Sequence, residues 1–232
     1  MMRNCLVLCL VATIGGACEH HEDAGEGAPP DSAEIAAAEL AILAVGDSAL
    51  AWNGALSTPR QLQAALKERG VDALVVNASV SGATLSCGED DLGTPDNCIP
   101  PQLQNGAWDY VLLSGGANDI MESGCTPADA FINASLNGGK TVEFIEQIKG
   151  QGAHVLLYGY FDPLTKESEF ATCLSIRDLL DRYKSLGDLD DSVTFIDAGA
   201  VVTPDQPSFY ADDVHPSPKG SAAIAAYIAD NL

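Results

Sequence analysis

Five short apolar runs recur along the chain. They are Leu40–Val45, Ala73–Asn77, Tyr110–Ser114, His154–Tyr158 and Val193–Asp197. Each run is continuously apolar instead of alternating between apolar and polar residues, which is typical of strands that are buried on both faces. The pattern therefore predicts five strands inside a sheet that is covered on both sides.

Amphipathic segments follow or precede these runs. The clearest are Pro59–Arg69, Thr141–Lys149, Cys173–Leu186 and Ser217–Ile228. In the second of them, Val142, Ile145 and Ile148 recur every three residues and share one helical face. Pro59 suits a first helical position, and Gly70 follows the end of that segment. Alternation of strands and helices predicts a single α/β domain with a parallel sheet and right-handed crossovers.

Two connections lack regular periodicity and are unusually long. Gly82–Ala107 follows the second predicted strand, and Ser114–Gly139 follows the third. Both leave the carboxyl end of a strand, where parallel sheets place their ligand sites. Connections of this length are uncommon unless they bind, cover or gate something. We therefore expect the functional site along this edge of the sheet.

Composition narrows the classes of function. The 232 residues suffice for one sizeable domain, and their formal net charge is −22. Such a surface repels phosphate backbones and anionic headgroups, so we expect no nucleic-acid partner. The acidic Glu89-Asp90-Asp91 lacks the ligand spacing of a calcium loop, and we predict no metal. We expect a monomer.

The first residues resemble an export signal. Residues 1–17 combine a short basic start with an apolar run that is too short to span a bilayer. Gly15-Gly16-Ala17-Cys18 resembles a bacterial lipobox, in which Cys18 would carry the lipid. An ordinary signal peptide cleaved near Ala17 is the alternative. We expect an exported protein that is periplasmic, extracellular or anchored to the outer membrane through Cys18.

The remaining N-terminal residues and the cysteines fit this interpretation. Residues 18–38, rich in Glu, Ala, Gly and Pro, are predicted to be a flexible tether leading to one domain over residues 39–232. Of the seven cysteines, two lie in the signal, and lipidation of Cys18 would leave Cys87, Cys98, Cys125 and Cys173. Four cysteines permit two disulfides in three connectivities.

The first predicted strand ends in Gly46-Asp47-Ser48, which places a serine at the carboxyl edge. Such a serine is a nucleophile if a base reaches it, and histidine is the usual base. The candidates are His20, His21, His154 and His215. The first two lie in the predicted tether, and the third opens the fourth strand at the opposite edge. Only His215, which follows the last strand, lies at the edge of Ser48.

A carboxylate stands close to His215 in the sequence. A catalytic imidazole is held in one tautomer by an acceptor on its second nitrogen. Asp212 lies three residues before His215, so one turn of chain brings the two side chains together. Asp213 is adjacent and tends to point elsewhere, which makes it the weaker candidate. Surface charges beside a helix cap are the alternative interpretation of both.

Two further segments at this edge offer donors for an oxyanion. Ser79-Val80-Ser81-Gly82 follows the second strand, and glycine lets a backbone N–H approach a ligand closely. Gly115–Asp119 follows the third strand, and the amide of Asn118 can donate. Each segment taken alone is more typical of a turn after a strand. The second lacks the glycine and lysine pattern of a phosphate loop.

In combination, these segments resemble the SGNH/GDSL hydrolase family over most of residues 40–232. Gly46-Asp47-Ser48 resembles its first block, with Ser48 as the nucleophile. Gly82 and Gly116-Ala117-Asn118-Asp119 resemble the second and third blocks, which supply the oxyanion hole together with the N–H of Ser48. Asp212-Asp213-Val214-His215 resembles the last block, with His215 as the base and Asp212 as its partner.

The resemblance implies a flavodoxin-like three-layer α/β/α sandwich with a five-stranded parallel sheet in the order 2-1-3-4-5. It also implies hydrolysis of carboxylic esters through an acyl-enzyme, without a cofactor. The substrate would be a small-molecule or polysaccharide ester. A carbohydrate O-acetylesterase or O-acetyltransferase of the same fold is an alternative, and a catalytically silent binding module is an alternative from another class.

The implied strand order also suggests how the cysteines pair. Cys87 and Cys98 would be joined within one loop, and Cys125 and Cys173 would join neighbouring loops. Ala49-Leu50-Ala51-Trp52 follows the serine where family members often carry a small polar residue and glycine. The aromatic residues Trp52, Tyr160 and Phe161 follow strands one and four, and either line the cleft or belong to the core.

Overall fold

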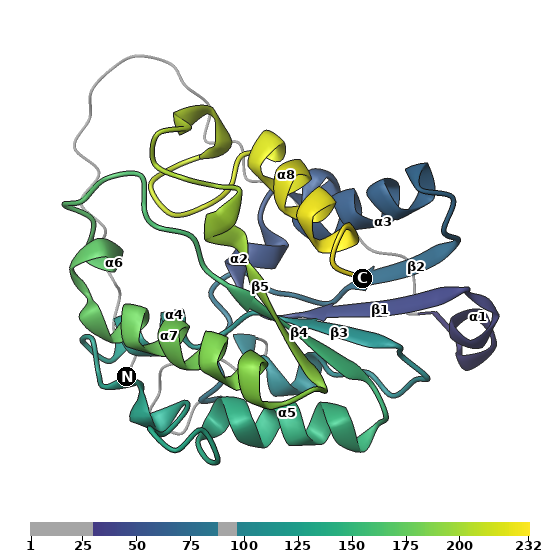
Figure 1. Ribbon diagram of the computed structural model, residues 1–232, viewed down its shortest axis with the longest axis horizontal. Helices are drawn as coiled ribbons and strands as arrows, with labels where there is room; N and C mark the ends of the chain where they lie inside the picture. The colour runs from purple at the N-terminus through teal and green to yellow at the C-terminus, as the bar shows by residue number, and fades with distance from the viewer. Residues whose placement is uncertain (1–29, 88–96) are drawn as a thin grey trace, which may run out of the picture.

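A computed structural model describes residues 30–87 and 97–232. Within them, five parallel strands form one sheet in the order β2-β1-β3-β4-β5 (Figure 1). The strands are β1 (Leu40–Val45), β2 (Ala73–Asn77), β3 (Tyr110–Leu113), β4 (His154–Gly159) and β5 (Val193–Asp197). The predicted strand order is confirmed, and every strand matches its apolar run to within one residue at each end.

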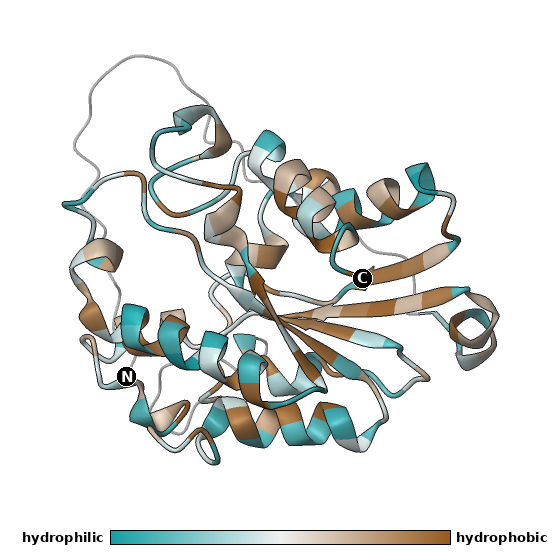
Figure 2. Ribbon diagram, in the orientation of Figure 1, coloured by the Kyte–Doolittle hydropathy of each residue, from teal (hydrophilic) through white to brown (hydrophobic). Residues whose placement is uncertain are grey.

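Helices cover both faces of the sheet, as the sandwich prediction requires (Figure 1). Helices α3 (Thr58–Glu68) and α8 (Pro218–Ala229) lie on one face, and α5 (Lys140–Gly150) and α7 (Leu174–Leu189) lie on the other. In Figure 2 the strands are largely hydrophobic, and hydrophobic stripes stand beside hydrophilic residues on helices such as α5 and α7. Burial of these stripes against the sheet is the main source of stability.

Short helical turns occupy the connections at the carboxyl edge and elsewhere. The α-helical turns are α1 (Ser32–Ala37), α2 (Ser48–Ala51), α4 (Ala117–Glu122) and α6 (Glu169–Thr172), and 3₁₀ turns span Gly54–Leu56, Pro100–Gln102, Ala128–Ala130, Ala198–Ala200 and Pro207–Phe209. The paired register Val45↔Leu113 ends β1 and β3 at the same level. The segments that follow these two strands therefore start side by side.

The predicted tether is wrong at its C-terminal end, because residues 32–37 form helix α1. Asp31 caps this helix, and its Oδ1 accepts the N–H groups of Ala33 and Glu34 at 2.9 Å each. Ile35 is 3% exposed and joins the core, so the folded domain begins before residue 39. The predicted signal over residues 1–17, Cys18, His20 and His21 lie outside the described residues.

One of the two expected disulfides is present. Cys125 and Cys173 are bonded, with their Cα atoms 5.7 Å apart. The predicted Cys87–Cys98 disulfide is wrong, because these residues are thiols joined by a hydrogen bond in the structure. Burial and the hydrogen bond with Cys98 raise the pKa of the Cys87 thiol to about 12. The loop ends are closed by backbone hydrogen bonds instead, since the N–H of Thr84 donates to the carbonyl of Asn97 and the carbonyl of Thr84 accepts the N–H of Ile99.

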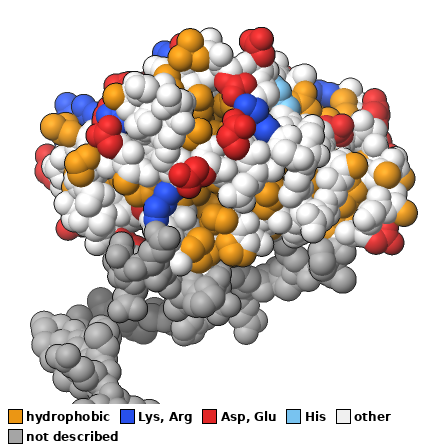
Figure 3. Space-filling model, turned by 90° about the horizontal axis from the view of Figure 1, so that it is seen from below, with side chains coloured by type: hydrophobic (Ala, Val, Ile, Leu, Met, Phe, Trp, Pro, Cys, Tyr) orange, Lys and Arg blue, Asp and Glu red, His pale blue; other side chains and the backbone are white. Residues whose placement is uncertain are grey.

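Charged side chains are interspersed with apolar ones on the face viewed in Figure 3, so the acidic excess forms no single patch there. Within residues 30–87 and 97–232, no helix is long and apolar enough to cross a membrane. The same residues contain no cluster of three or more His, Cys, Asp or Glu side chains that could hold a metal ion.

An ion pair links the end of α5 to the end of α7 and predicts a pH-dependent stability. Lys149 Nζ lies 2.9 Å from Asp190 Oδ2, and hydrogen bonds from Lys149 and Ser192 lower the pKa of Asp190 to about 2. A carboxyl whose folded pKa is depressed stabilises the protein above its unfolded pKa, and this contribution is lost as pH falls toward the folded value. Asp190→Asn should therefore lower the free energy of unfolding by about 1 kcal/mol at pH 7 and by less at pH 3.

Denaturant unfolding at the two pH values measures this difference. Asp191→Asn, a change at the neighbouring position, is the matched control and should have little effect at either pH. An equal loss of stability at pH 7 and pH 3 for Asp190→Asn would contradict the prediction.

Candidate active site

Ser48 is the first residue of α2, directly after β1. Asp47 caps this helix, because its Oδ1 accepts the N–H of Ala49 at 3.0 Å. Gly46 has φ +149°, and a Cβ there would lie 2.2 Å from Ser114 Oγ. Only glycine lets the chain turn this close to the end of β3. Gly46 thus permits the close turn and Asp47 caps the helix, and together they place Ser48 at the start of α2.

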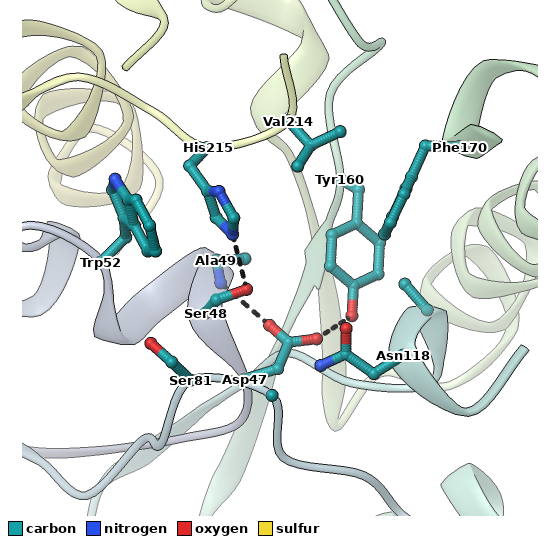
Figure 4. A pocket seen from close by; sticks show the side chains of 12 residues that line it. Asp47, Ser48, Ala49, Trp52, Ser81, Asn118, Tyr160, Phe170, Val214 and His215 are labelled. Atoms are coloured by element: carbon teal, nitrogen blue, oxygen red, sulfur yellow. Dashed lines mark hydrogen bonds between the residues drawn. The ribbon is translucent and has the colours of Figure 1, made fainter. Parts of the chain in front are cut away.

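The structure brings together the three residues that the sequence singled out for a triad, and Figure 4 shows two of them, Ser48 and His215. His215 Nε2 lies 2.9 Å from Ser48 Oγ, and His215 Nδ1 lies 2.7 Å from Asp212 Oδ2. Asp212 Oδ1 also accepts the N–H groups of Val214 and His215, at 2.9 and 2.8 Å. One short turn of chain therefore fixes the carboxylate of Asp212 beside Nδ1 of the imidazole.

Electrostatics keep Asp212 ionised. Burial raises the pKa of Asp212, but hydrogen bonds from His215 and Val214 outweigh burial and leave the pKa below its ordinary value. Asp213 points away, as expected, and its Oδ1 accepts the N–H of Thr165 at 2.8 Å. His154 opens β4, and its Nε2 lies 2.8 Å from Thr194 Oγ1, so it is at the opposite edge, as the sequence indicated.

Trp52 stacks on the ring of His215. The ring centroids are 3.9 Å apart and the planes differ by 7°. The stack covers one face of the imidazole and restricts its rotation about the Cβ bond. The sequence left Trp52 undecided between cleft and core, and the structure places it in the pocket wall.

A buried network of hydrogen bonds holds Gly46 and Asp47, the two residues that precede Ser48. Asp47 is 2% exposed and accepts hydrogen bonds from Tyr160 Oη at 2.5 Å and Ser114 Oγ at 2.9 Å. Burial raises the pKa of Asp47, and these hydrogen bonds oppose the rise. Gln102 clamps Gly46 by accepting its N–H at 2.6 Å and donating to its carbonyl at 3.0 Å. Sequence reasoning missed the roles of Ser114 and Gln102.

The two predicted donor segments also meet at this site. Gly82, with φ +78°, and Asn118 both line the pocket. Asn118 Nδ2 donates to the carbonyl of Ala83 at 3.0 Å, which orients the amide and leaves its second N–H available. Asp119 accepts the N–H groups of Leu85 at 2.9 Å and Ser86 at 2.8 Å, so it ties α4 to the loop after β2.

These residues surround a pocket of about 370 Å³. Its apolar walls include Trp52, Tyr160, Phe170 and Val214. Phe161 belongs to the core instead and is 8% exposed. Phe170 was not expected here, because nothing in the local pattern shows that the chain after β4 turns back toward Ser48.

The pocket therefore combines a serine, an imidazole held by a carboxylate, and backbone and amide donors. Residues 44–223 match the model of the GDSL-like lipase/acylhydrolase family. The chain belongs to this family. It is accordingly an ester hydrolase, and the resemblance found in its sequence is confirmed. No curated protein matches the chain significantly.

Solved structures of GDSL proteins and esterases share the fold. A member of the lipolytic G-D-S-L family from Veillonella parvula is 14% identical with a TM-score of 0.61, covering 83% of this chain and 97% of its own. A carbohydrate acetylesterase family member from Sinorhizobium meliloti is 21% identical with a TM-score of 0.59, covering 83% and 96%. The acetyl xylan esterase AlAXEase is 19% identical with a TM-score of 0.56, covering 83% and 100%.

Proposed function

We propose that this chain is a serine esterase that cleaves carboxylic esters through an acyl-enzyme, with Ser48, His215 and Asp212 as its triad. The observation that carries the proposal is the continuous chain of hydrogen bonds from Ser48 Oγ through His215 to Asp212 at 2.9 and 2.7 Å. Nucleophile, base and orienting carboxylate are each within the reach that acyl transfer requires.

The chemistry follows from these positions. Ser48 Oγ attacks the acyl carbonyl carbon while His215 Nε2 takes the hydroxyl proton. The tetrahedral intermediate collapses, and His215 passes that proton to the leaving alcohol. Water then attacks the acyl-Ser48 ester, again with His215 as the base, and the carboxylic acid leaves as Ser48 recovers its proton. Asp212 stabilises the imidazolium that forms in each half-reaction.

Three donors belong to residues that line the pocket and are suited to the oxyanion. They are the backbone N–H groups of Ser48 and Gly82 and the second N–H of the Asn118 amide. Preorganised donors of this kind stabilise the negative charge that develops on the carbonyl oxygen. No step requires a metal or a cofactor.

Asn118→Ala provides a direct measure of the oxyanion role. We expect kcat to fall about 10²–10³-fold with little change in KM, since the amide contacts the oxyanion more strongly than the ground-state carbonyl. Steady-state kinetics on p-nitrophenyl acetate measures both constants. The exposed Asn105→Ala is the control. A rise in KM alone would show that Asn118 binds substrate and does not stabilise the transition state.

A carbohydrate O-acetylesterase is the second candidate. Two of the structural neighbours are described as an acetyl xylan esterase and a carbohydrate acetylesterase family member, which favours acetylated polysaccharides as substrates. Acetate release from acetylated xylan, compared with hydrolysis of p-nitrophenyl esters, distinguishes the two. Transfer of acetyl to an added sugar in place of water would identify an acetyltransferase. Absence of any turnover or covalent labelling would identify a silent binding module.

We further propose that the enzyme is exported, with residues 1–17 as the signal and Cys18 as a lipid attachment site. The basic start, the apolar run and the Gly-Gly-Ala-Cys sequence support this proposal. Expression of the full chain in a bacterium supplied with labelled palmitate tests it. We expect label in the wild-type protein and none in Cys18→Ser. Export without label in both would support simple cleavage near Ala17.

A further inference from the structure

The segment between β4 and α7 is attached at one end to the loop that carries His215 and at the other end to the connection after α4, which carries Asn118. At one end, the N–H groups of Leu164 and Thr165 donate to the carbonyl and Oδ1 of Asp213, both at 2.8 Å. At the other end, Cys173 forms the disulfide with Cys125. Residues 164–173 are therefore attached both to the loop that carries His215 and to the end of the connection that begins with α4.

Both attachment points lie close in sequence to residues of the active site. Asp213 is the neighbour of Asp212, and Cys125 comes three residues after the end of α4, whose second residue is Asn118. In Figure 1 the segment, including α6, runs along the side of the molecule at the carboxyl edge of the sheet. Its position is consequently fixed relative to both the base and the amide donor.

Phe170 projects from this segment into the pocket. It lies in the single turn of α6, which Ser168 caps by accepting the N–H of Ala171 at 3.0 Å. A four-residue helix has little stability of its own, so neighbouring attachments must hold it. The buried Cys173 directly follows this turn, and its N–H donates to the carbonyls of Glu169 and Phe170 at 3.1 and 3.3 Å. The disulfide is the nearest covalent attachment of Phe170.

The two sides of the pocket contact different parts of the ester. His215 must reach the leaving oxygen, so the alcohol part of the ester lies on the side of His215 and Trp52. Tyr160 and Phe170 stand on the other side of Ser48 from Trp52 (Figure 4). The hydroxyl of Tyr160 is bound to Asp47, which leaves its ring as a fixed wall. The acyl group accordingly extends toward Phe170.

We propose that Phe170 sets the length of acyl group that the enzyme accepts, and that the Cys125–Cys173 disulfide holds it in that position. Phe170 is thus a specificity-determining residue, and the disulfide is its positioning device. This inference rests on the proposed serine esterase function. It assigns a short acyl group to the wild-type enzyme, because the aromatic ring of Phe170 forms the pocket wall on the side of the acyl group.

Substitutions in opposite directions test the role of Phe170. The measurement is kcat/KM for p-nitrophenyl acetate, butyrate and octanoate. Phe170→Ala should raise the octanoate-to-acetate ratio about tenfold or more, and Phe170→Trp should lower the butyrate-to-acetate ratio by a similar factor. Leu174→Ala, a change at a 71% exposed apolar residue next to the disulfide, is the matched control and should leave both ratios unchanged.

The disulfide is tested by Cys125→Ser/Cys173→Ser. We expect the octanoate-to-acetate ratio to rise, and we expect no further rise when this change is combined with Phe170→Ala, because both act through the same side chain. A purely structural role would lower turnover of all three esters equally and leave the ratio unchanged. Thermal unfolding of each variant shows that the compared proteins are folded.

The outcomes separate this inference from the function on which it rests. Unchanged ratios in both Phe170 variants, with acetate turnover intact and dependent on Ser48, would overturn the role of Phe170 and leave the esterase intact. Changed ratios in the Phe170 variants but not in the cysteine variant would overturn the role of the disulfide. No turnover of any ester by the wild-type enzyme would overturn both the function and the inference.

Discussion

Ser48→Ala is expected to abolish ester hydrolysis, with a fall in kcat of about 10⁶-fold if the acylation route is lost completely. The reason is that Ser48 Oγ forms the acyl-enzyme in the proposed mechanism, and His215 at 2.9 Å has no other hydroxyl to activate at that distance among the hydrogen bonds of the described residues. Turnover of p-nitrophenyl acetate measures the loss. A fluorophosphonate probe should label Ser48 in the wild-type enzyme, as located by mass spectrometry, and should leave Ser48→Ala unlabelled.

Ser185→Ala is the matched control, because it removes the hydroxyl of an exposed serine on α7. We expect this variant to retain both activity and labelling. Retained turnover in Ser48→Ala would refute the assignment of the nucleophile. Labelling at another serine would identify a different active residue.

Asp212→Asn should lower kcat by about 10⁴-fold. In this variant the amide NH2 group can stand in place of Oδ2 and donate to His215 Nδ1. Such a hydrogen bond favours the tautomer with its proton on Nε2, in which Nε2 cannot take the proton of Ser48. The neutral amide also does not stabilise an imidazolium. The 2.7 Å contact between Asp212 Oδ2 and His215 Nδ1 is the interaction that is lost. The pKa of Asp212 lies below its ordinary value, so the wild-type carboxylate is ionised at neutral pH and above.

Asp213→Asn is the matched control for Asp212→Asn. Asp213→Asn also removes one negative charge, yet Asp213 binds the N–H of Thr165 and not the imidazole. We expect kcat to change less than about tenfold, since a neutral amide oxygen can still accept that N–H. Similar losses in the two variants would mean that net charge near His215 matters and that the specific contact of Asp212 does not.

The sheet was predictable because its strands are buried on both faces. Continuous apolar runs such as Leu40–Val45 leave little choice of secondary structure, and the run matches β1 at both ends. The positions of Ser48 and His215 followed from parallel topology, since both come after strands and must lie at the same edge. Their contact across 167 positions of sequence is therefore a consequence of strand order.

Other parts of the site depend on how irregular segments return to the pocket. Gln102 and Phe170 both lie in connections, and a residue pattern does not show where such a connection turns back. Helix α1 was missed because its composition is typical of linkers, although Asp31 is a good cap and Ile35 supplies an apolar anchor. The Cys87–Cys98 pairing failed because two cysteines of one loop lie in contact as thiols, and proximity in sequence does not show whether such a contact is a bond.

The stacking of Trp52 on His215 gives the enzyme an internal optical signal. The chain has two tryptophans, and the other, Trp108, is 3% exposed and donates its Nε1–H to the carbonyl of Gln104 at 3.0 Å. A protonated imidazole in van der Waals contact quenches indole emission, whereas a neutral one does so weakly. Tryptophan emission should therefore report the charge of His215, the proposed base, in the absence of substrate and during each half of the reaction.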